Sequence, residues 1–105
     1  MAWTLEYTKQ ANSDLNELDN SQKKQVLKAI LKVAHNPLPQ SKGGYGKPLG
    51  NNLTGFLKIK LRKLGIRVCY RLVYENEVMR VVIISIRTDE QVYKLLQQRI
   101  TKGQT

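Results

Sequence analysis

The middle of the chain alternates apolar and polar residues at the period of a β-strand, and this alternation constrains the fold more than any other feature. Residues 56–62 read FLKIKLR, so every second side chain of a strand would point to the same face. One face would carry Leu57, Ile59 and Leu61, and the other would carry Phe56, Lys58, Lys60 and Arg62.

Two further strand-like runs follow at short intervals. Lys63-Leu64-Gly65 is typical of a tight turn into a second strand over residues 66–74, and Glu75-Asn76-Glu77 turns into a third over residues 78–86. Consecutive strands joined by short turns predict an antiparallel meander.

The first third of the chain changes from the period of a strand to that of a helix. Residues 3–7 alternate as a short strand, and from Thr8 onward the apolar residues recur at helical spacing. Asn20 or Ser21 would cap a second helix, which would end just before Pro37 because the residue before a proline avoids the helical conformation. Since the turn between them is so short, the two helices are expected to form an antiparallel hairpin.

The last predicted strand is followed by a final helix. Thr88 is a suitable N-cap, and Gln91 three residues later completes a capping box. Asp89 and Glu90 suit the positive N-terminal end of this helix. The order of elements predicts one α+β domain over residues 1–105, in which the N-terminal strand and helical hairpin pack as two layers on a mainly antiparallel sheet. The first strand is expected at an edge of the meander or beside its last strand.

A loop rich in glycine and proline connects the helices to the meander. Its segment Gly43-Gly44-Tyr45-Gly46-Lys47 has the composition of a loop that binds phosphate. Such loops follow a strand and precede a helix, and neither is predicted here. We therefore interpret residues 37–55 as an ordinary connection.

The charge of the chain favours a polyanionic partner. The net charge is +10, and six cations and no acid occur between Lys58 and Arg71. Nucleic acid, an anionic membrane surface and an acidic protein all satisfy such a charge. A solvated basic face is the usual explanation of a charge run, but here the cations alternate with apolar residues of a strand.

The sequence favours a cytoplasmic protein without a membrane partner or a cofactor. The only cysteine, Cys69, cannot form an internal disulfide. The N-terminal stretch lacks the pattern of a signal peptide, and the apolar runs are far shorter than the ~20 residues that cross a bilayer. Together with the single histidine, His35, one cysteine cannot form a metal site of the His/Cys type.

The basic strand offers chemistry that suits RNA. Clustered cations bind a phosphodiester and stabilise the extra negative charge that develops during displacement at phosphorus. RNA supplies its own nucleophile, the 2′-hydroxyl, and a lysine crowded by other cations has a lowered pKa and can act as the base. By spacing alone, a module that only binds nucleic acid is at least as well supported. The candidate residues are Lys58, Lys60, Arg67, Arg87 and Tyr93.

Residues 58–70 follow the pattern Lys-x-Lys-Leu-Arg-x-x-Gly-x-Arg-x-x-Tyr, and further matching segments lie at 47–49, 53–55, 84–87 and 92–93. On these residues the chain resembles the RelE/ParE superfamily of type II toxins, closest to the RelE branch. The resemblance implies the RelE-like α+β fold. It also implies a metal-independent endoribonuclease that cuts mRNA in the ribosomal A site by attack of the 2′-hydroxyl.

The same resemblance implies roles for individual residues. Lys58 and Lys60 match two catalytic lysines, one a general base and the other a phosphate stabiliser. Arg67 matches a transition-state arginine, Arg87 an arginine that stabilises charge or assists the leaving group, and Tyr93 a tyrosine that engages the substrate nucleotide. The implied partners are a cognate antitoxin, mRNA and the ribosome with its 16S rRNA. Contacts to ribosomal RNA, or plain solvated charge, are the interpretation of Arg62, Lys63 and Arg71.

The sequence departs from the family pattern just before Tyr93. Thr88, Asp89 and Glu90 replace the basic or histidine residues common there, and the two acids lower the local positive potential. A ParE-like toxin that inhibits DNA gyrase is one alternative, although that branch generally lacks the basic set kept here. A non-catalytic module that binds nucleic acid or the antitoxin is another.

Overall fold

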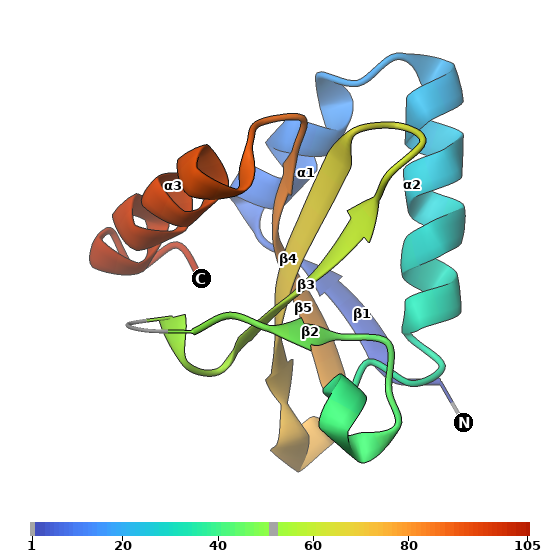
Figure 1. The fold of residues 1–105 in the computed structure, drawn as a ribbon, viewed down its shortest axis with the longest axis vertical. Coiled ribbons are helices and arrows are strands. Elements are labelled where there is room, and N and C mark those ends of the chain that lie inside the picture. Colours follow the sequence, from blue (N-terminus) through green and yellow to red (C-terminus); the bar gives the residue numbers. More distant parts are fainter. Residues whose placement is uncertain (1, 51–52) are drawn as a thin grey trace.

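A computed structural model describes residues 2–50 and 53–105 of the chain. They form a five-stranded sheet in the order β1-β5-β4-β3-β2, together with three α-helices (Figure 1). The strands are β1 (Thr4–Tyr7), β2 (Lys47–Pro48), β3 (Phe56–Leu61), β4 (Ile66–Val73) and β5 (Val78–Ser85), and the helices are α1 (Lys9–Asn16), α2 (Asn20–Val33) and α3 (Asp89–Thr101).

The three long strands form the predicted meander. β3 pairs with β4 and β4 pairs with β5, both antiparallel, and Lys60 lies directly opposite Arg67. The register between β4 and β5 shifts between Cys69 and Tyr70. β1 lies beside β5 and runs parallel to it, so the first strand takes one of the two positions that the sequence left open.

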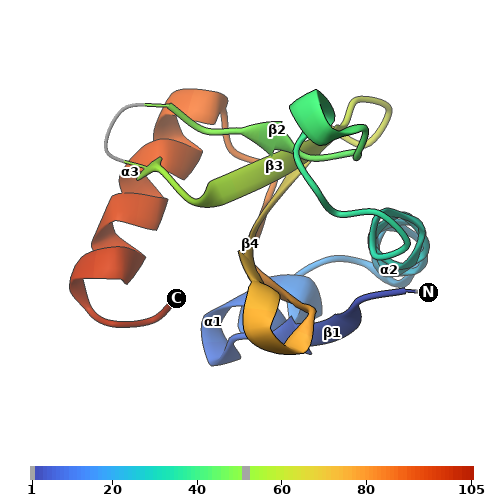
Figure 2. The ribbon, with the colours of Figure 1, turned by 90° about the horizontal axis from the view of Figure 1, so that it is seen from below.

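Helices cover both faces of the sheet, and each face has its own apolar core. α1 and α2 pack on one face, where Ile30 and Tyr70 are fully buried. α3 packs on the other face, where Leu96 contacts the cluster that includes Cys69. Figure 2 shows α2 and α3 on opposite sides of β4. The predicted α+β class with a C-terminal helix is confirmed. The fold has three layers rather than the two expected, because α3 covers the second face of the sheet.

The helix boundaries are set by local capping. The N-cap of α2 is Asp19 rather than the predicted residues that follow it, since Asp19 and Gln22 form a reciprocal capping box. The helix ends at Val33, earlier than predicted. α3 begins as predicted, with the capping box of Thr88 and Gln91. Within the described part of the chain, no helix is both long and apolar enough to cross a membrane.

Candidate functional site

One face of the meander, near the turn between β3 and β4, carries the basic residues that the sequence indicated. Lys58 and Lys60 are two residues apart in β3 and therefore share a face of the strand. Arg67 is paired with Lys60 across the two strands and lies on the same face. The first turns of α3 lie over these cations, because Asp89 and Tyr93 contact them.

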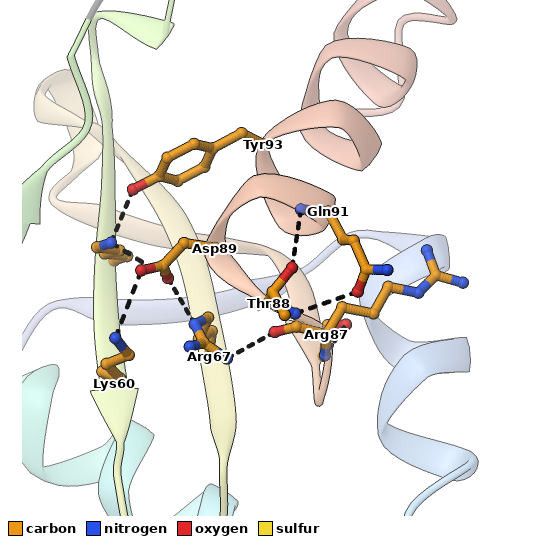
Figure 3. Close-up of polar contacts among 9 residues, drawn as sticks. Lys60, Arg67, Arg87, Thr88, Asp89, Gln91 and Tyr93 are labelled. Carbon is orange, nitrogen blue, oxygen red and sulfur yellow. Dashed lines mark hydrogen bonds and ion pairs between the residues drawn. The ribbon is translucent and has the colours of Figure 1, made fainter.

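Asp89 joins the three cations. Its Oδ1 atom lies 3.4 Å from Nζ of Lys58 and accepts a 2.5 Å hydrogen bond from Nε of Arg67. Its Oδ2 atom lies 3.4 Å from Nζ of Lys60. Figure 3 shows Asp89 between Lys60 and Arg67. We call these four residues the Asp89 cluster, in which one carboxylate faces three positive charges.

Tyr93 is held against Lys58. It lies one helical turn after Asp89, so both side chains project from the same side of α3. Nζ of Lys58 donates a 2.7 Å hydrogen bond to the Tyr93 hydroxyl and lies 5.1 Å from the centroid of the ring. The side chain of Lys58 is only 9% exposed, whereas that of Lys60 is 40% exposed. Lys60 is therefore the lysine that a substrate reaches more easily.

The pKa values in the cluster follow from this geometry. Burial acts to lower the pKa of Lys58, but the hydrogen bond to Tyr93 and the charge of Asp89 outweigh it and raise the pKa above its ordinary value. Burial acts to raise the pKa of Asp89, but the hydrogen bond from Arg67 and the nearby lysines lower it to about 2. The prediction that neighbouring cations lower a lysine pKa is thus wrong for Lys58, because a carboxylate lies among the cations.

The side chain of Arg87 does not join the cluster. Its backbone carbonyl accepts a 2.6 Å hydrogen bond from Nη1 of Arg67, while its guanidinium points away from Asp89 (Figure 3). Arg87 lines a separate hollow together with Glu17, the C-cap residue of α1. The fold therefore brings together the predicted catalytic residues other than Arg87, whose catalytic role stays a prediction.

A groove of about 510 Å³ opens beside the Asp89 cluster. It lies along β3 where that strand extends past its short pairing with β2, and it is flanked by α2 and by the loop that precedes β2. We call it the basic groove. Its charged and aromatic lining residues are Lys32, Tyr45, Lys47, Lys58, Lys60, Arg62 and Asp89.

The three predicted RNA-binding residues occupy different positions relative to this groove. Arg62 lines it, and Lys63 is exposed in the adjoining turn between β3 and β4. Arg71 is half-buried at the far end of β4, opposite Phe56. Arg62 and Lys63 are thus accessible beside the site, and Arg71 is not part of its lining.

The cysteine has no catalytic setting. Cys69 is buried in β4 on the face that α3 covers, and burial raises the pKa of its thiol to about 12. The thiol is therefore protonated at neutral pH and packs as an apolar group. Among the residues that the structure describes, no three His, Cys, Asp or Glu side chains are grouped so that they could hold a metal ion.

Two parts of this site are absent from the sequence prediction. Asp89 carries a sequence signal for the start of a helix, but its contacts with the cations depend on where α3 lies over the sheet. Lys32 and Tyr45 line the groove from α2 and from a loop, and their spacing gives no sign of this. The signal that the sequence does offer is a tyrosine with a glycine on each side, Gly44-Tyr45-Gly46.

The family described as ParE toxin of type II toxin-antitoxin system, parDE, matches residues 5–93. The matched span contains β2 to β5, all of β1 except its first residue, and the part of α3 that carries Asp89 and Tyr93. No curated protein matches the chain.

Solved structures of RelE toxins are similar to this chain. The free E. coli toxin RelE with two arginines changed to alanine is 25% identical, with a TM-score of 0.76 over 95% of this chain and 99% of that chain. The same mutant toxin bound to an antitoxin RelBc peptide is 24% identical, with a TM-score of 0.71 over 91% of this chain and 95% of that chain. The toxin-antitoxin complex RelBE2 from Mycobacterium tuberculosis is 24% identical, with a TM-score of 0.60 over 83% of this chain and 100% of that chain.

Proposed function

The chain belongs to the ParE toxin family of type II toxin-antitoxin systems, and we propose that within this family it is a toxin that cleaves mRNA in the ribosomal A site and so inhibits translation. The observation that carries the proposal is the Asp89 cluster beside the basic groove, where three cations surround one carboxylate and Tyr93 contacts Lys58, and a phosphodiester would take the place of that carboxylate. The fold alone would not support this choice, since one fold serves several functions.

In the proposed reaction, the 2′-hydroxyl of one nucleotide attacks the adjacent phosphorus. A general base takes the hydroxyl proton, the P–O2′ bond forms, the P–O5′ bond breaks, and the leaving oxygen takes up a proton. The products are a 2′,3′-cyclic phosphate and a 5′-hydroxyl. Cations accelerate this step if they hold the phosphoryl oxygens more tightly in the transition state than in the ground state.

The exposure and charge of each side chain suggest its role in the proposed reaction. Lys58 stays protonated because its pKa is raised, and Arg67 is always charged, so both are assigned to the phosphoryl oxygens. Lys60 is the accessible lysine in the groove and is assigned as the general base. Tyr93 is assigned to the sugar or base of the substrate nucleotide, with Lys58 fixing the position of its hydroxyl.

Asp89 has a defined place in this scheme. Its two oxygens contact the same three cations that a substrate phosphate would contact, and Arg and Lys bind carboxylate and phosphate oxygens in the same way. Binding of RNA therefore requires the carboxylate to turn away. Its side chain is 36% exposed at the first turn of α3, so solvent is available to receive it.

The proposal includes the partners of the toxin. Arg62 and Lys63 lie next to the site and would contact phosphates of 16S rRNA, which position a protein without reading sequence. A cognate antitoxin is supported by the complexes of similar toxins with their antitoxins. Ribosomes and mRNA place the proposed activity in the cytoplasm, with no membrane partner and no metal or other cofactor.

Mapping mRNA 5′ ends after incubation with programmed ribosomes tests the proposal. We expect cuts within the A-site codon by the wild type, and their loss in Lys60→Ala and Arg67→Ala. Lys102→Ala is a matched control, because this lysine is exposed at the end of α3 and should be dispensable.

The family match favours one alternative, a toxin that acts on DNA gyrase. A gyrase assay with the same protein preparation separates the two functions. Intact mRNA together with accumulation of gyrase-cleaved DNA would show that the protein inhibits gyrase instead of cleaving mRNA. Intact mRNA and unaffected gyrase would leave a non-catalytic binding module.

A further inference from the structure

A loop presents an exposed tyrosine in the basic groove. Tyr45 is 48% exposed and lines the groove together with Lys58 and Lys60. Nζ of Lys32 lies 5.7 Å from the centroid of its ring. Lys47, two residues further on, is paired with Lys58 across β2 and β3. An aromatic ring among cations is the arrangement that binds single-stranded nucleic acid, since bases stack on the ring while cations hold the backbone.

The glycines on both sides of Tyr45 are packed so tightly that a side chain at either position would clash with its neighbours. A Cβ atom on Gly44 would lie 1.9 Å from the carbonyl oxygen of Leu38, and a Cβ atom on Gly46 would lie 2.2 Å from the Tyr70 hydroxyl. Gly44 therefore packs against the backbone of Leu38 within the same loop, and Gly46 packs against Tyr70 of β4. The ring points outward from a backbone that has little freedom to move.

Backbone hydrogen bonds hold this loop as well. The N–H of Tyr45 donates to the carbonyl of Asn36 at 3.1 Å, and the N–H of Gln40 donates to the carbonyl of Gly46 at 2.8 Å. The side-chain amide of Asn36 donates to the carbonyl of Gly43 at 3.1 Å. A ring that is held in place before binding loses little conformational entropy when a ligand stacks on it.

We propose that Tyr45 is a stacking platform for an unpaired base of the RNA substrate, one nucleotide or more away from the phosphate that the Asp89 cluster binds. Lys32 and Lys47 contact the phosphates that flank this base. Lys58 contacts Tyr93 of α3 and also lines the groove with Tyr45, so it links the two aromatic residues of the site. The inference rests on the proposed function, and it adds a second base-binding position to that site.

The test measures binding of a short single-stranded RNA whose 2′-hydroxyls are methylated, so that it cannot be cleaved. We expect Tyr45→Ala to lower the affinity about fivefold to a hundredfold, which corresponds to the loss of one stacked base. Tyr45→Phe keeps the ring and should bind within about twofold of the wild type. Tyr74→Ala is the matched control, because Tyr74 is 57% exposed but contacts Trp3 away from the groove.

Abasic versions of the probe identify the interaction as stacking. Removal of the base at one position should weaken binding by the wild type and have little effect on Tyr45→Ala, because the ring and the base then act as one pair. Equal binding by Tyr45→Ala and the wild type, with weaker binding by Lys60→Ala, would overturn the stacking role and leave the proposed function intact. Loss of affinity for the antitoxin alone in Tyr45→Ala would overturn the stacking role in the same way. A wild type that neither binds the probe nor cuts mRNA would overturn both.

Discussion

Asp89 places a carboxylate among the three cations that the sequence assigns to RNA. In the free protein this carboxylate offsets the repulsion among Lys58, Lys60 and Arg67. In the proposed function, RNA binding requires the carboxylate to give up the same cations to a phosphate. Asp89 would therefore support the folded state and oppose substrate binding.

The first prediction concerns RNA affinity. Asp89→Asn removes a negative charge close to the proposed phosphate position, and two unit charges about 4 Å apart in water interact by about 1 kcal/mol. We expect binding of the methylated RNA to become about fivefold tighter. Fluorescence anisotropy at low and high salt measures this, and Glu90→Gln, an exposed neighbour paired with Lys94, is the control. Loss of cleavage with unchanged or weaker binding would instead assign Asp89 a direct part in the reaction.

The second prediction concerns stability and pH. The pKa of Asp89 is lowered from 3.8 to about 2, so its contribution to the free energy of unfolding is full above pH 3.8 and is lost as the pH falls through about 2. Wild type should therefore be more stable than Asp89→Asn at pH 5, and the difference should shrink toward pH 2. Urea unfolding at constant ionic strength measures the difference. A difference that does not change with pH would show that the carboxylate charge is not the cause.

At the scale of elements, local patterns in the sequence predict most of the fold. The alternation around Lys58 and Lys60 gives the strand and the face on which they lie, and the capping box gives the start of α3. Several residues at the start of α2 are suitable N-caps, and the N-cap is Asp19 rather than Asn20 or Ser21 as predicted. The loop before β2 carries no periodic signal, so its part in the basic groove follows only from tertiary packing.

The third prediction tests how tightly this loop is held. Gly46→Ala would bring a Cβ atom to 2.2 Å from the Tyr70 hydroxyl and 2.9 Å from Cδ2 of Leu57. Overpacking of this kind costs about 1–3 kcal/mol of unfolding free energy. Gly50→Ala is the matched control, since a Cβ atom there meets nothing within 4 Å. Equal stabilities of the two variants in urea unfolding would mean that the loop yields easily and does not fix Tyr45.

At the scale of the whole molecule, an ion pair joins the helices that cover opposite faces of the sheet. Arg99 of α3 donates hydrogen bonds of 2.8 and 2.9 Å to the carboxylate of Asp14 in α1, and one of 2.7 Å to the carbonyl of Val82. Asp14 also accepts from the N–H of Ile84 at 3.1 Å. The two helices can meet here because β1 pairs with β5 only as far as Val81. This contact joins the two cores past the edge of the sheet.

The fourth prediction measures that contact. Asp14→Ala leaves the largely buried Arg99 guanidinium without its partner, which costs about 3–5 kcal/mol for a buried pair. Glu90→Ala breaks the ion pair with Lys94, whose side chains are 82% and 75% exposed, and should cost less than about 1 kcal/mol. Thermal or urea unfolding compares the two. Similar losses would show that the pair of Asp14 and Arg99 contributes no more to stability than an exposed ion pair does.

The candidate site combines residues from distant parts of the chain, and this limits what the sequence predicts of it. Lys58, Lys60 and Arg67 are close because the short turn between β3 and β4 sets the pairing of these two strands, and that turn is visible in the sequence. Tyr93 and Asp89 reach them because α3 packs on the same face of the sheet, and Tyr45 reaches the groove through the loop beyond α2. The direction of the Arg87 side chain depends on the bend between β5 and α3, which no pattern in the sequence fixes.

The central claim is cleavage of RNA by attack of its own 2′-hydroxyl at the Asp89 cluster. The most direct measurement is to determine the fragment ends from programmed ribosomes that carry either an all-RNA A-site codon or a codon with a single 2′-deoxy nucleotide at the cut position. We predict fragments with 5′-hydroxyl and 2′,3′-cyclic phosphate ends from the all-RNA codon, and no cut at the deoxy position or with Lys60→Ala. Cutting that persists at the deoxy nucleotide, or intact mRNA in both cases, would contradict the account.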